Sequence, residues 1–382
     1  MDQMSSVPHF PPPPPLPASS VKVEFSGSRS DFFRLVRNGA ALEVITVGFY
    51  RFWLATDIRR HLWSNSVIDG DAAEYTGRAR ELLIGFLFAM AILVPIYLGY
   101  FLVTVEAERL QGFASVPLFV LFYGFAQFAI YRARRYRLTR TVWRGVRFWM
   151  DGSGWAYAWR AMLWGLLAIV TLGLALPWRE AALERYKMSH SWYGDLQGSF
   201  EGSPWEFFKS AWHLWLAAPF AMVLFPLFPF VYARFKAAEW RWWLEGVRFG
   251  DVRLESDLPD NALQGVYWKV IGWYFLVAVA LTVFQGVAGA IIGWSGALHQ
   301  PGGTATFSKD VTFLVLTVIS YLAAILSLNV VVRLYLLRDV WVKVLESVRV
   351  LDIETAADVA AKGDLASALG EGFADGLDVA GF

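Results

Sequence analysis

The segment YRFWLATDIRRHLWS (Tyr50–Ser64) and the segment SVIDGDAAEYTG that follows it (Ser66–Gly77) decide how this chain folds. The first combines arginines with aromatic rings directly after an apolar run, a composition typical of a membrane surface. The second has short β-prone pieces on both sides of Asp69-Gly70, and glycine accepts the positive φ that a tight hairpin turn requires. An apolar helix, a basic-aromatic helix and a hairpin, in this order, therefore predict one structural unit.

The same order of segments recurs along the chain. The second arm of the hairpin also ends in glycine in several copies, as in EYTG at Gly77, SFEG at Gly202 and ALQG at Gly265, and VEFSG stands before the first copy. Recurrence of one supersecondary pattern predicts a fold built from repeated units. The further copies are Ile130–Tyr157, Leu176–Gly202, Val231–Asp257 and Val331–Thr355.

The composition is that of a membrane protein. Hydrophobic residues form 56% of the 382 residues and charged residues 18%, whereas soluble domains hold about 45–50% and about 25%. The 19 tryptophans are also in excess, and tryptophan gathers where apolar and wet surroundings meet. We therefore expect an all-α polytopic membrane protein. It would consist of about five diverged repeats of apolar helix, basic-aromatic helix and short cytosolic β-hairpin, with some segments re-entrant.

Three parts of the chain differ in composition. Residues 1–20, which include HFPPPPPLPASS, predict a disordered Pro-rich leader. Residues 21–354 form the expected repeat-built membrane domain. Residues 355–382 form an acidic tail that we expect in the cytosol, since residues 351–382 hold seven acidic residues and one basic residue.

Hydropathy and charge predict the topology. A spanning helix needs about 20 mostly apolar residues, and basic connections remain cytosolic. We therefore expect a multi-pass protein of the bacterial inner membrane with both termini and all basic clusters in the cytosol. The segments that qualify for crossing are Leu82–Thr104, Ser115–Ile130, Val266–Gly293 and Val311–Val332.

Three further apolar segments are less suited to crossing. Leu163–Leu176 is short, Asn38–Trp53 is short and contains Glu43, and Trp212–Val231 contains three prolines. These features favour re-entrant hairpins, and the alternative is that all seven segments cross. A carboxylate such as Glu43 beside lipid is either a functional group or simply faces water.

The first unit resembles a known family. The stretch Val47–Ala89 is similar to the YjgN-type family of bacterial inner-membrane proteins, whose function is unknown, and the ending GEGFADGLDVAGF (Gly370–Phe382) is similar as well. The resemblance implies the location and the fold over about residues 21–382, and it brings no catalytic residues. Its strongest points are Tyr50-Arg51-Phe52-Trp53, Arg59-Arg60 with Trp63, Asp69-Gly70, and Tyr75-Thr76-Gly77.

Motifs for catalysis, cofactors and metals are missing from the sequence. The chain has no cysteine, which excludes disulfides and thiolate chemistry. It has no P-loop, no GxSxG, no GxGxxG, and no histidine pair at metal-binding spacing. We therefore assign no catalytic, cofactor-binding or metal-binding residues, and we expect no enzymatic activity and no cofactor.

The opening segment supplies the candidate site. Arg51, Arg59 and Arg60, flanked by Trp53 and Trp63, either mark the headgroup plane by charge or bind anionic lipid headgroups specifically. Membrane lipids are thus the expected partners. Nucleic acid is not expected, because each basic cluster adjoins an apolar run. Downstream of these residues, Asp69 and Gly70 are assigned a structural role in the hairpin turn.

Two classes of function fit these observations. Repeats and broken helices are common in transporters, so the first is a transporter or channel-like protein. The alternative is a non-transporting membrane scaffold or lipid-interacting protein.

Overall fold

The structure is a computed structural model that describes residues 20–106, 111–224, 227–297, 303–363 and 365. The expected Pro-rich leader, apart from Ser20, lies outside the described residues. So does most of the acidic tail, from residue 366 onward.

Helices form most of the chain, and they follow one another in pairs. A π-helix, η3, joins the last long helix to a short one. The helices are α1 (Arg29–Ile45), α2 (Arg51–Ser64), α3 (Ala79–Glu106), α4 (Gln111–Thr139), α5 (Gly154–Val170), α6 (Leu176–Ser189), α7 (Pro204–Val223), α8 (Phe228–Gly246), α9 (Gln264–Ala297), α10 (Gly303–Val331), η3 (Val332–Asp339), α11 (Val340–Glu346) and the 3₁₀-helix η4 (Ile353–Ala356).

Short strands separate the helix pairs. They are β1 (Ser20–Phe25), β2 (Ser66–Ile68), β3 (Asp71–Ala72), β4 (Glu74–Tyr75), β5 (Thr141–Trp143), β6 (Val146–Met150), β7 (Ser191–Tyr193), β8 (Leu196–Phe200), β9 (Val247–Phe249), β10 (Val252–Ser256) and β11 (Val348–Leu351).

The expectation of an all-α fold with separate hairpins is wrong, because the strands form one sheet. Among the described residues it has eleven antiparallel strands in the order β3-β2-β1-β11-β10-β9-β8-β7-β6-β5-β4. The two ends of this order, β3 and β4, are separated in the chain by Ala73 alone. The sheet therefore curls until its ends meet, and it is nearly closed like a barrel. Closure removes the exposed strand edges that separate hairpins would have.

The register explains how the hairpins join. In β6, Arg147 pairs with Val142 of its own hairpin, whereas Phe148 pairs with Tyr193 of the next one. The strands β8 and β10 divide their pairing in the same way. The strand β1 acts as the second arm for β11 at the other end of the chain, because Lys22 pairs with Arg349 and Val23 pairs with Ile68.

One backbone hydrogen bond recurs at every step around this sheet. The N–H group directly after the strand that leads into a helix pair donates to the carbonyl directly before the strand that follows that pair. The N···O distances are 2.8–3.0 Å at the five places seen among the described residues. The pairs are Ser26–Asn65, Thr76–Arg140, Asp151–His190, Glu201–Gly246 and Asp257–Ser347.

Apolar side chains fill the inside of the sheet. Val23, Trp143, Tyr193 and Val350 belong to one buried cluster although they come from four different strands. The segment after β11 adds to it, because Ile353 joins the cluster. Close by, the backbone N–H of Ala360 donates to Asp195 Oδ1 over 3.1 Å. The sheet thus encloses a packed core.

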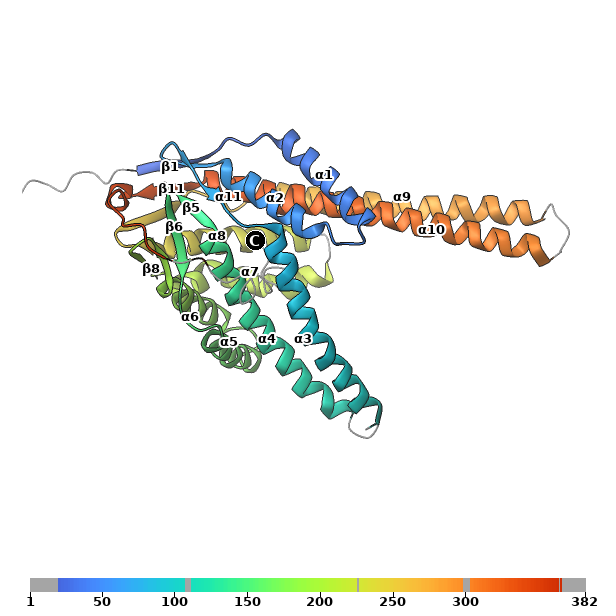
Figure 1. Ribbon diagram of the computed structural model, residues 1–382, viewed down its shortest axis with the longest axis horizontal. Helices are drawn as coiled ribbons and strands as arrows, with labels where there is room; N and C mark the ends of the chain where they lie inside the picture. The colour runs from blue at the N-terminus through green and yellow to red at the C-terminus, as the bar shows by residue number, and fades with distance from the viewer. Residues whose placement is uncertain (1–19, 107–110, 225–226, 298–302, 364, 366–382) are drawn as a thin grey trace, which may run out of the picture.

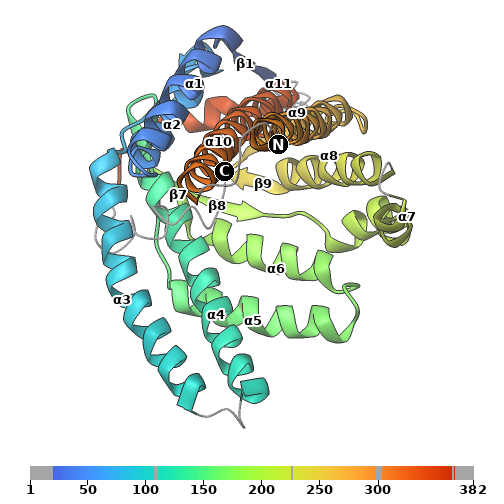
Figure 2. The ribbon, with the colours of Figure 1, turned by 90° about the vertical axis from the view of Figure 1, so that its right-hand side faces the viewer.

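The helix pairs leave the sheet on one side and stand around it (Figures 1 and 2). Consecutive pairs touch through α2 and α3, α4 and α5, α6 and α7, and α8 and α9, and the last pair returns to the first through α10 and α1. The pairs α3–α4 and α9–α10 extend far beyond the others and diverge from each other (Figure 1).

Four helices of the described part are long and apolar enough to cross a membrane. They cover Ala79–Leu102, Val116–Thr139, Gln264–Ile292 and Val311–Glu346. These are the four segments that hydropathy selects, and they make the chain compatible with a membrane protein. Few of their side chains are buried in the single chain, at most 28% of any spanning segment, and the others are half-buried or exposed.

Candidate functional site

The junctions between sheet and helices gather the basic residues of the second helix in each pair. Arg60 Nη2 donates to the carbonyl oxygen of Gly77 over 2.8 Å, where the chain leaves β4 for α3. Equivalent bonds recur at other junctions, and such a charge-assisted bond fixes the path of the chain into the next helix. They join Arg185 to Gly202 (3.2 Å), Arg241 to Leu258 (2.6 Å) and Arg338 to Gly27 (3.0 Å).

The glycine of the hairpin motif is explained by close packing at these junctions. A Cβ atom on Gly77 would lie 2.5 Å from the ring of Tyr75, and one on Gly202 would lie 2.5 Å from the ring of Phe200. The assignment of ALQG to this motif is wrong. Gly265 lies inside α9, and Leu258 takes the junction position.

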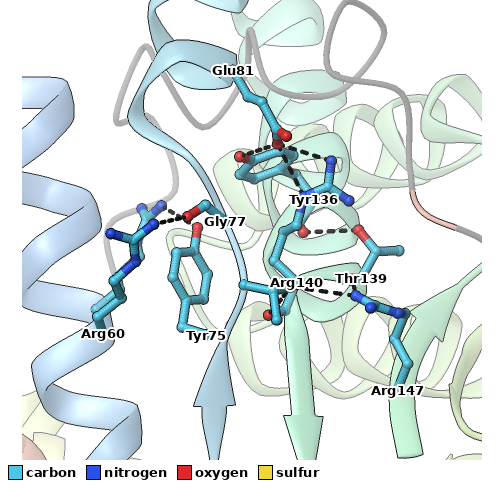
Figure 3. Close-up of polar contacts among 10 residues, drawn as sticks. Arg60, Tyr75, Gly77, Glu81, Tyr136, Thr139, Arg140 and Arg147 are labelled. Atoms are coloured by element: carbon cyan, nitrogen blue, oxygen red, sulfur yellow. Dashed lines mark hydrogen bonds and ion pairs between the residues drawn. The ribbon is translucent and has the colours of Figure 1, made fainter.

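Figure 3 shows the junction of the first and second pairs. Glu81, in the first turn of α3, accepts hydrogen bonds from Tyr136 Oη (2.9 Å) and from Arg140 Nε and Nη2 (3.0 and 2.9 Å). Arg147 Nη1 donates to the carbonyl of Thr139 over 2.6 Å. These contacts link α3, α4 and β6 into one polar network.

The three arginines of the opening segment lie in different surroundings. Arg59 is 1% exposed, and its Nη1 lies 3.3 Å from Tyr75 Oη. The side chain of Arg60 is 51% exposed, although it also donates a hydrogen bond to the carbonyl of Gly77. The guanidinium of Arg51 lies 4.4 Å from the ring centre of Phe86. Only Arg59 and Arg60 share a junction, so the three do not form one surface.

The two flanking tryptophans make contacts inside the protein. The ring of Trp53 stacks on Tyr50, and that of Trp63 stacks on Trp341 with ring centres 5.0 Å apart. Trp63 Nε1 also donates to Thr141 Oγ1 over 3.1 Å. Headgroup contact by these residues stays a prediction. Of the three arginines, Arg60 is exposed, Arg51 is half-buried and Arg59 is buried.

Asp69 and Gly70 occupy the centre of the turn between β2 and β3. Their φ angles are 52° and 80°, and Ile68 pairs with Asp71 across the turn. Two central residues with positive φ define a type I′ turn. Arg144, at the tip of the next hairpin, binds Asp69 and Asp71 over 2.7 and 2.6 Å, which ties neighbouring hairpins together.

Sequence reasoning missed a second set of basic and aromatic residues, on the first helix of each pair. Arg78 directly precedes α3, the others lie on the first three turns of these helices, and all of these side chains are exposed. The signal for them is present in GWAYAWR (Gly154–Arg160), which directly follows a hairpin. We call this set the belt: Arg34, Arg78, Arg80, Trp155, Trp159, Arg160, Trp205, Lys209, Trp212, Lys269 and Trp273.

A buried ionic cluster links α4 and α6. Glu184 binds Arg134 over 3.0 Å and also contacts Lys187. Burial alone would raise the pKa of Glu184, but these two cations hold it at about 2, below its ordinary value of 4.5. Burial lowers the pKa of Lys187 against the opposing charge of Glu184. Because the carboxylate has two cationic neighbours, Glu184 is ionised at neutral pH.

Other candidate groups are also in ion pairs. Glu43, which the sequence places beside lipid, binds Arg333 over 2.9 Å and links α1 to η3. Within the part of the chain that the structure describes, no three His, Asp or Glu side chains are grouped to hold a metal ion. The polar groups here therefore join helices and strands, and we assign no metal or cofactor to them.

Comparison with known proteins returns one match. A family model described as "Bacterial protein of unknown function (DUF898)" matches residues 20–376, which agrees with the resemblance to YjgN-type proteins. No curated protein and no solved structure matches the chain. Since the family model covers nearly the whole chain, the protein belongs to the DUF898 family of bacterial proteins of unknown function.

Proposed function

We propose that this protein is a non-transporting scaffold of the bacterial inner membrane that holds anionic lipids around its base. The observation that carries the proposal is the belt, in which exposed basic side chains lie at the start of α1, α3, α5, α7 and α9 and exposed tryptophans join them on α5, α7 and α9. Tryptophan favours the headgroup level, and each basic residue near an anionic surface contributes about 1 kcal/mol.

The orientation follows from the same residues. Basic residues mark the cytosolic side of short connections. The sheet, both termini and the belt then face the cytosol, and the connections at the far ends of α3–α4 and α9–α10 face the other side. In this arrangement five helix pairs occupy the cytosolic leaflet, whereas two pairs continue into the outer leaflet.

Two features favour a scaffold over a channel or transporter. Side chains such as Trp143 and Tyr193 pack together inside the sheet, which argues against a pore along its axis in the described part of the chain. The two spanning pairs also diverge and do not form one bundle (Figures 1 and 2). We assign no catalytic activity to the protein.

A transporter remains the second candidate because of one polar cluster in the α9–α10 pair. Gln285 Nε2 donates to Ser320 Oγ over 2.7 Å, and Thr317 Oγ1 donates to Gln285 Oε1 over 3.1 Å. Polar groups inside spanning helices often mark a pathway. Here they bind one another, which suits a link between the two helices. Vesicles that contain the protein and a trapped pH dye should show no added proton leak if the scaffold proposal is right.

Lipid counting tests the proposal directly. The double variant Arg160→Gln, Lys209→Gln removes two belt charges, whereas Arg253→Gln, Arg349→Gln removes two charges of similar exposure from the sheet. After purification with phosphatidylglycerol and phosphatidylcholine, native mass spectrometry should find less phosphatidylglycerol on the belt variant only. Equal retention by wild type and both variants would overturn the proposal.

A further inference from the structure

The turns at the far ends of the α1–α2 and α5–α6 pairs have the same structure. Each has the sequence Thr-X-Gly, where X is Val47 in the first turn and Leu172 in the second. Both X residues have positive φ, 52° and 51°, and the glycines after them have φ of 87° and 88°. Two turns far apart in the chain thus share one unusual backbone.

These turns satisfy their backbone N–H groups without water. The N–H of Gly48 donates to the backbone carbonyl of Glu43, and that of Gly173 donates to the backbone carbonyl of Ala168, both over 2.7 Å. The threonine at the start of each turn donates its hydroxyl to the carbonyl four residues earlier, and accepts the N–H four residues later. These bonds are Thr46–Leu42 (2.7 Å), Tyr50–Thr46 (2.9 Å), Thr171–Leu167 (2.8 Å) and Ala175–Thr171 (3.1 Å).

The residues at the tips are the wrong ones for a turn in water. Val47 is 87% exposed and Leu172 is 94% exposed. Both hold the left-handed conformation, which glycine or asparagine adopts more easily and which a β-branched residue such as Val47 resists. Exposure of a large apolar side chain to water is unfavourable, whereas its transfer from water into hydrocarbon lowers the free energy.

The surroundings of the tips are apolar as well. No charged residue lies between Glu43 and Arg51, nor between Arg160 and Arg179. Ile45 and Phe49 are exposed in the first pair, and Ile169, Val170 and Leu174 are exposed in the second. The α1–α2 turn points away from the strands toward the side of α9–α10 (Figure 1), whereas the α5–α6 pair extends outward crosswise to α9–α10 (Figure 2).

The depth of each tip follows from helix geometry. Leu172 lies 12 residues beyond Arg160 of the belt, and Val47 lies 13 residues beyond Arg34. At about 1.5 Å per residue, both tips lie roughly 18–20 Å from the belt along the helix axis, which is the greatest depth they can reach. Since the hydrocarbon core is about 30 Å thick, that distance can reach its middle but is too short for a crossing.

We propose that the α1–α2 and α5–α6 pairs are membrane-inserted wedges whose Thr-X-Gly turns sit among the acyl chains of the cytosolic leaflet. The partner of these tips is lipid hydrocarbon, and the inference rests on the proposed membrane orientation. The turn closes the pair where no water is available to bind its backbone, so the wedge ends inside the bilayer.

Spin labels measure the depth directly, and the chain has no cysteine to interfere. Labels go on Val47→Cys and Leu172→Cys, with Ile92→Cys in the middle of α3 and Ser153→Cys beside the sheet as references. The measurement is the accessibility of each label to oxygen and to a water-soluble nickel chelate, in vesicles of phosphatidylethanolamine and phosphatidylglycerol. Both tip labels should match the Ile92 label, with high accessibility to oxygen and low accessibility to the chelate. Tip labels that match Ser153 would overturn the wedges.

An asparagine substitution gives a second test with opposite signs. In water, Leu172→Asn would relieve the left-handed strain and raise the melting temperature. In hydrocarbon, the same change buries an amide and should lower the melting temperature in vesicles. A rise would overturn the inference. If the tip labels are in water but the belt still selects phosphatidylglycerol, only the wedge proposal is wrong. If the tip labels are deep but the belt shows no lipid selectivity, only the scaffold function is wrong.

Discussion

At the scale of single residues, the arginines divide into two groups that look alike in sequence. Those on the second helices, such as Arg60 and Arg338, donate to backbone carbonyls at the junctions. Those of the belt, such as Arg160, lie on the surface. The spacing of basic residues could predict that they recur near the membrane, but it could not tell which side chains fold inward.

Arg338 is a direct test of the junction bonds. Its side chain is buried and holds Gly27, which follows β1, so Arg338→Gln should remove a charge-assisted bond at the closure of the sheet. We expect a loss of about 1.5–3 kcal/mol in the free energy of unfolding. Thermal unfolding followed by circular dichroism measures it, with the exposed Arg34→Gln as control. Equal melting of the two variants would show that the bond is unimportant.

Gly70 tests the type I′ turn. Gly70 has φ of 80° and open space around its Cβ position, whereas Gly265 has the same open space without positive φ. Gly70→Val should therefore lose roughly 1–3 kcal/mol through backbone strain, whereas Gly265→Val should lose less. Yields of folded protein and melting curves of the pair decide the matter, and matching curves would argue against the strained turn.

The buried Glu184 predicts a pH dependence. Its folded pKa of about 2 lies below the ordinary 4.5, so its contribution is complete above pH 4.5 and is lost as the pH falls toward 2. The shift corresponds to roughly 3 kcal/mol. Wild type should lose melting temperature over this range, and Glu184→Gln should start lower at pH 7 and change less. A Glu184→Gln variant with the wild-type pH profile would refute the assignment.

At the scale of elements, long apolar runs made α3, α4, α9 and α10 predictable, and Asp69-Gly70 made the first hairpin predictable. The sheet was not predictable from these local signals. Its closure pairs Val21 with Val350, which are far apart in the chain, and strands of two to six residues carry little pattern of their own. No local sequence pattern indicates that β6 pairs with two hairpins or that β1 pairs with β11 to close the sheet.

The strand β1 supplies a test of that closure. Removal of residues 1–25 deletes β1 and exposes the edges of β11 and β2, whereas removal of residues 1–19 leaves it in place. We expect the longer deletion to lose monodisperse protein on size exclusion because exposed strand edges aggregate. The shorter deletion should behave as wild type. Two deletions with the same elution profile would mean that β1 is dispensable.

At the scale of the whole molecule, the helix pairs form a ring on a filled sheet. In the proposed orientation only α3–α4 and α9–α10 cross the bilayer, and the proposed wedges α1–α2 and α5–α6 end inside it. A wide base in one leaflet and two separate pairs in the other suit a protein that holds lipids more than one that conducts solutes. The recurring hydrogen bond from Ser26 to Asn65 and its equivalents holds the base together.

The proposed membrane orientation is tested most directly by the sidedness of the five junctions between helix pairs. Single cysteines replace the exposed residues Ser64, Ser153, Ser189, Glu245 and Glu346, one beside the sheet in each unit. In intact cells an impermeant maleimide should label none of them, and it should label all five after permeabilisation. Gln111→Cys, between two spanning helices, should be labelled in intact cells. Labelling of Ser189→Cys or Glu245→Cys in intact cells would contradict the account, because a short pair would then cross the membrane.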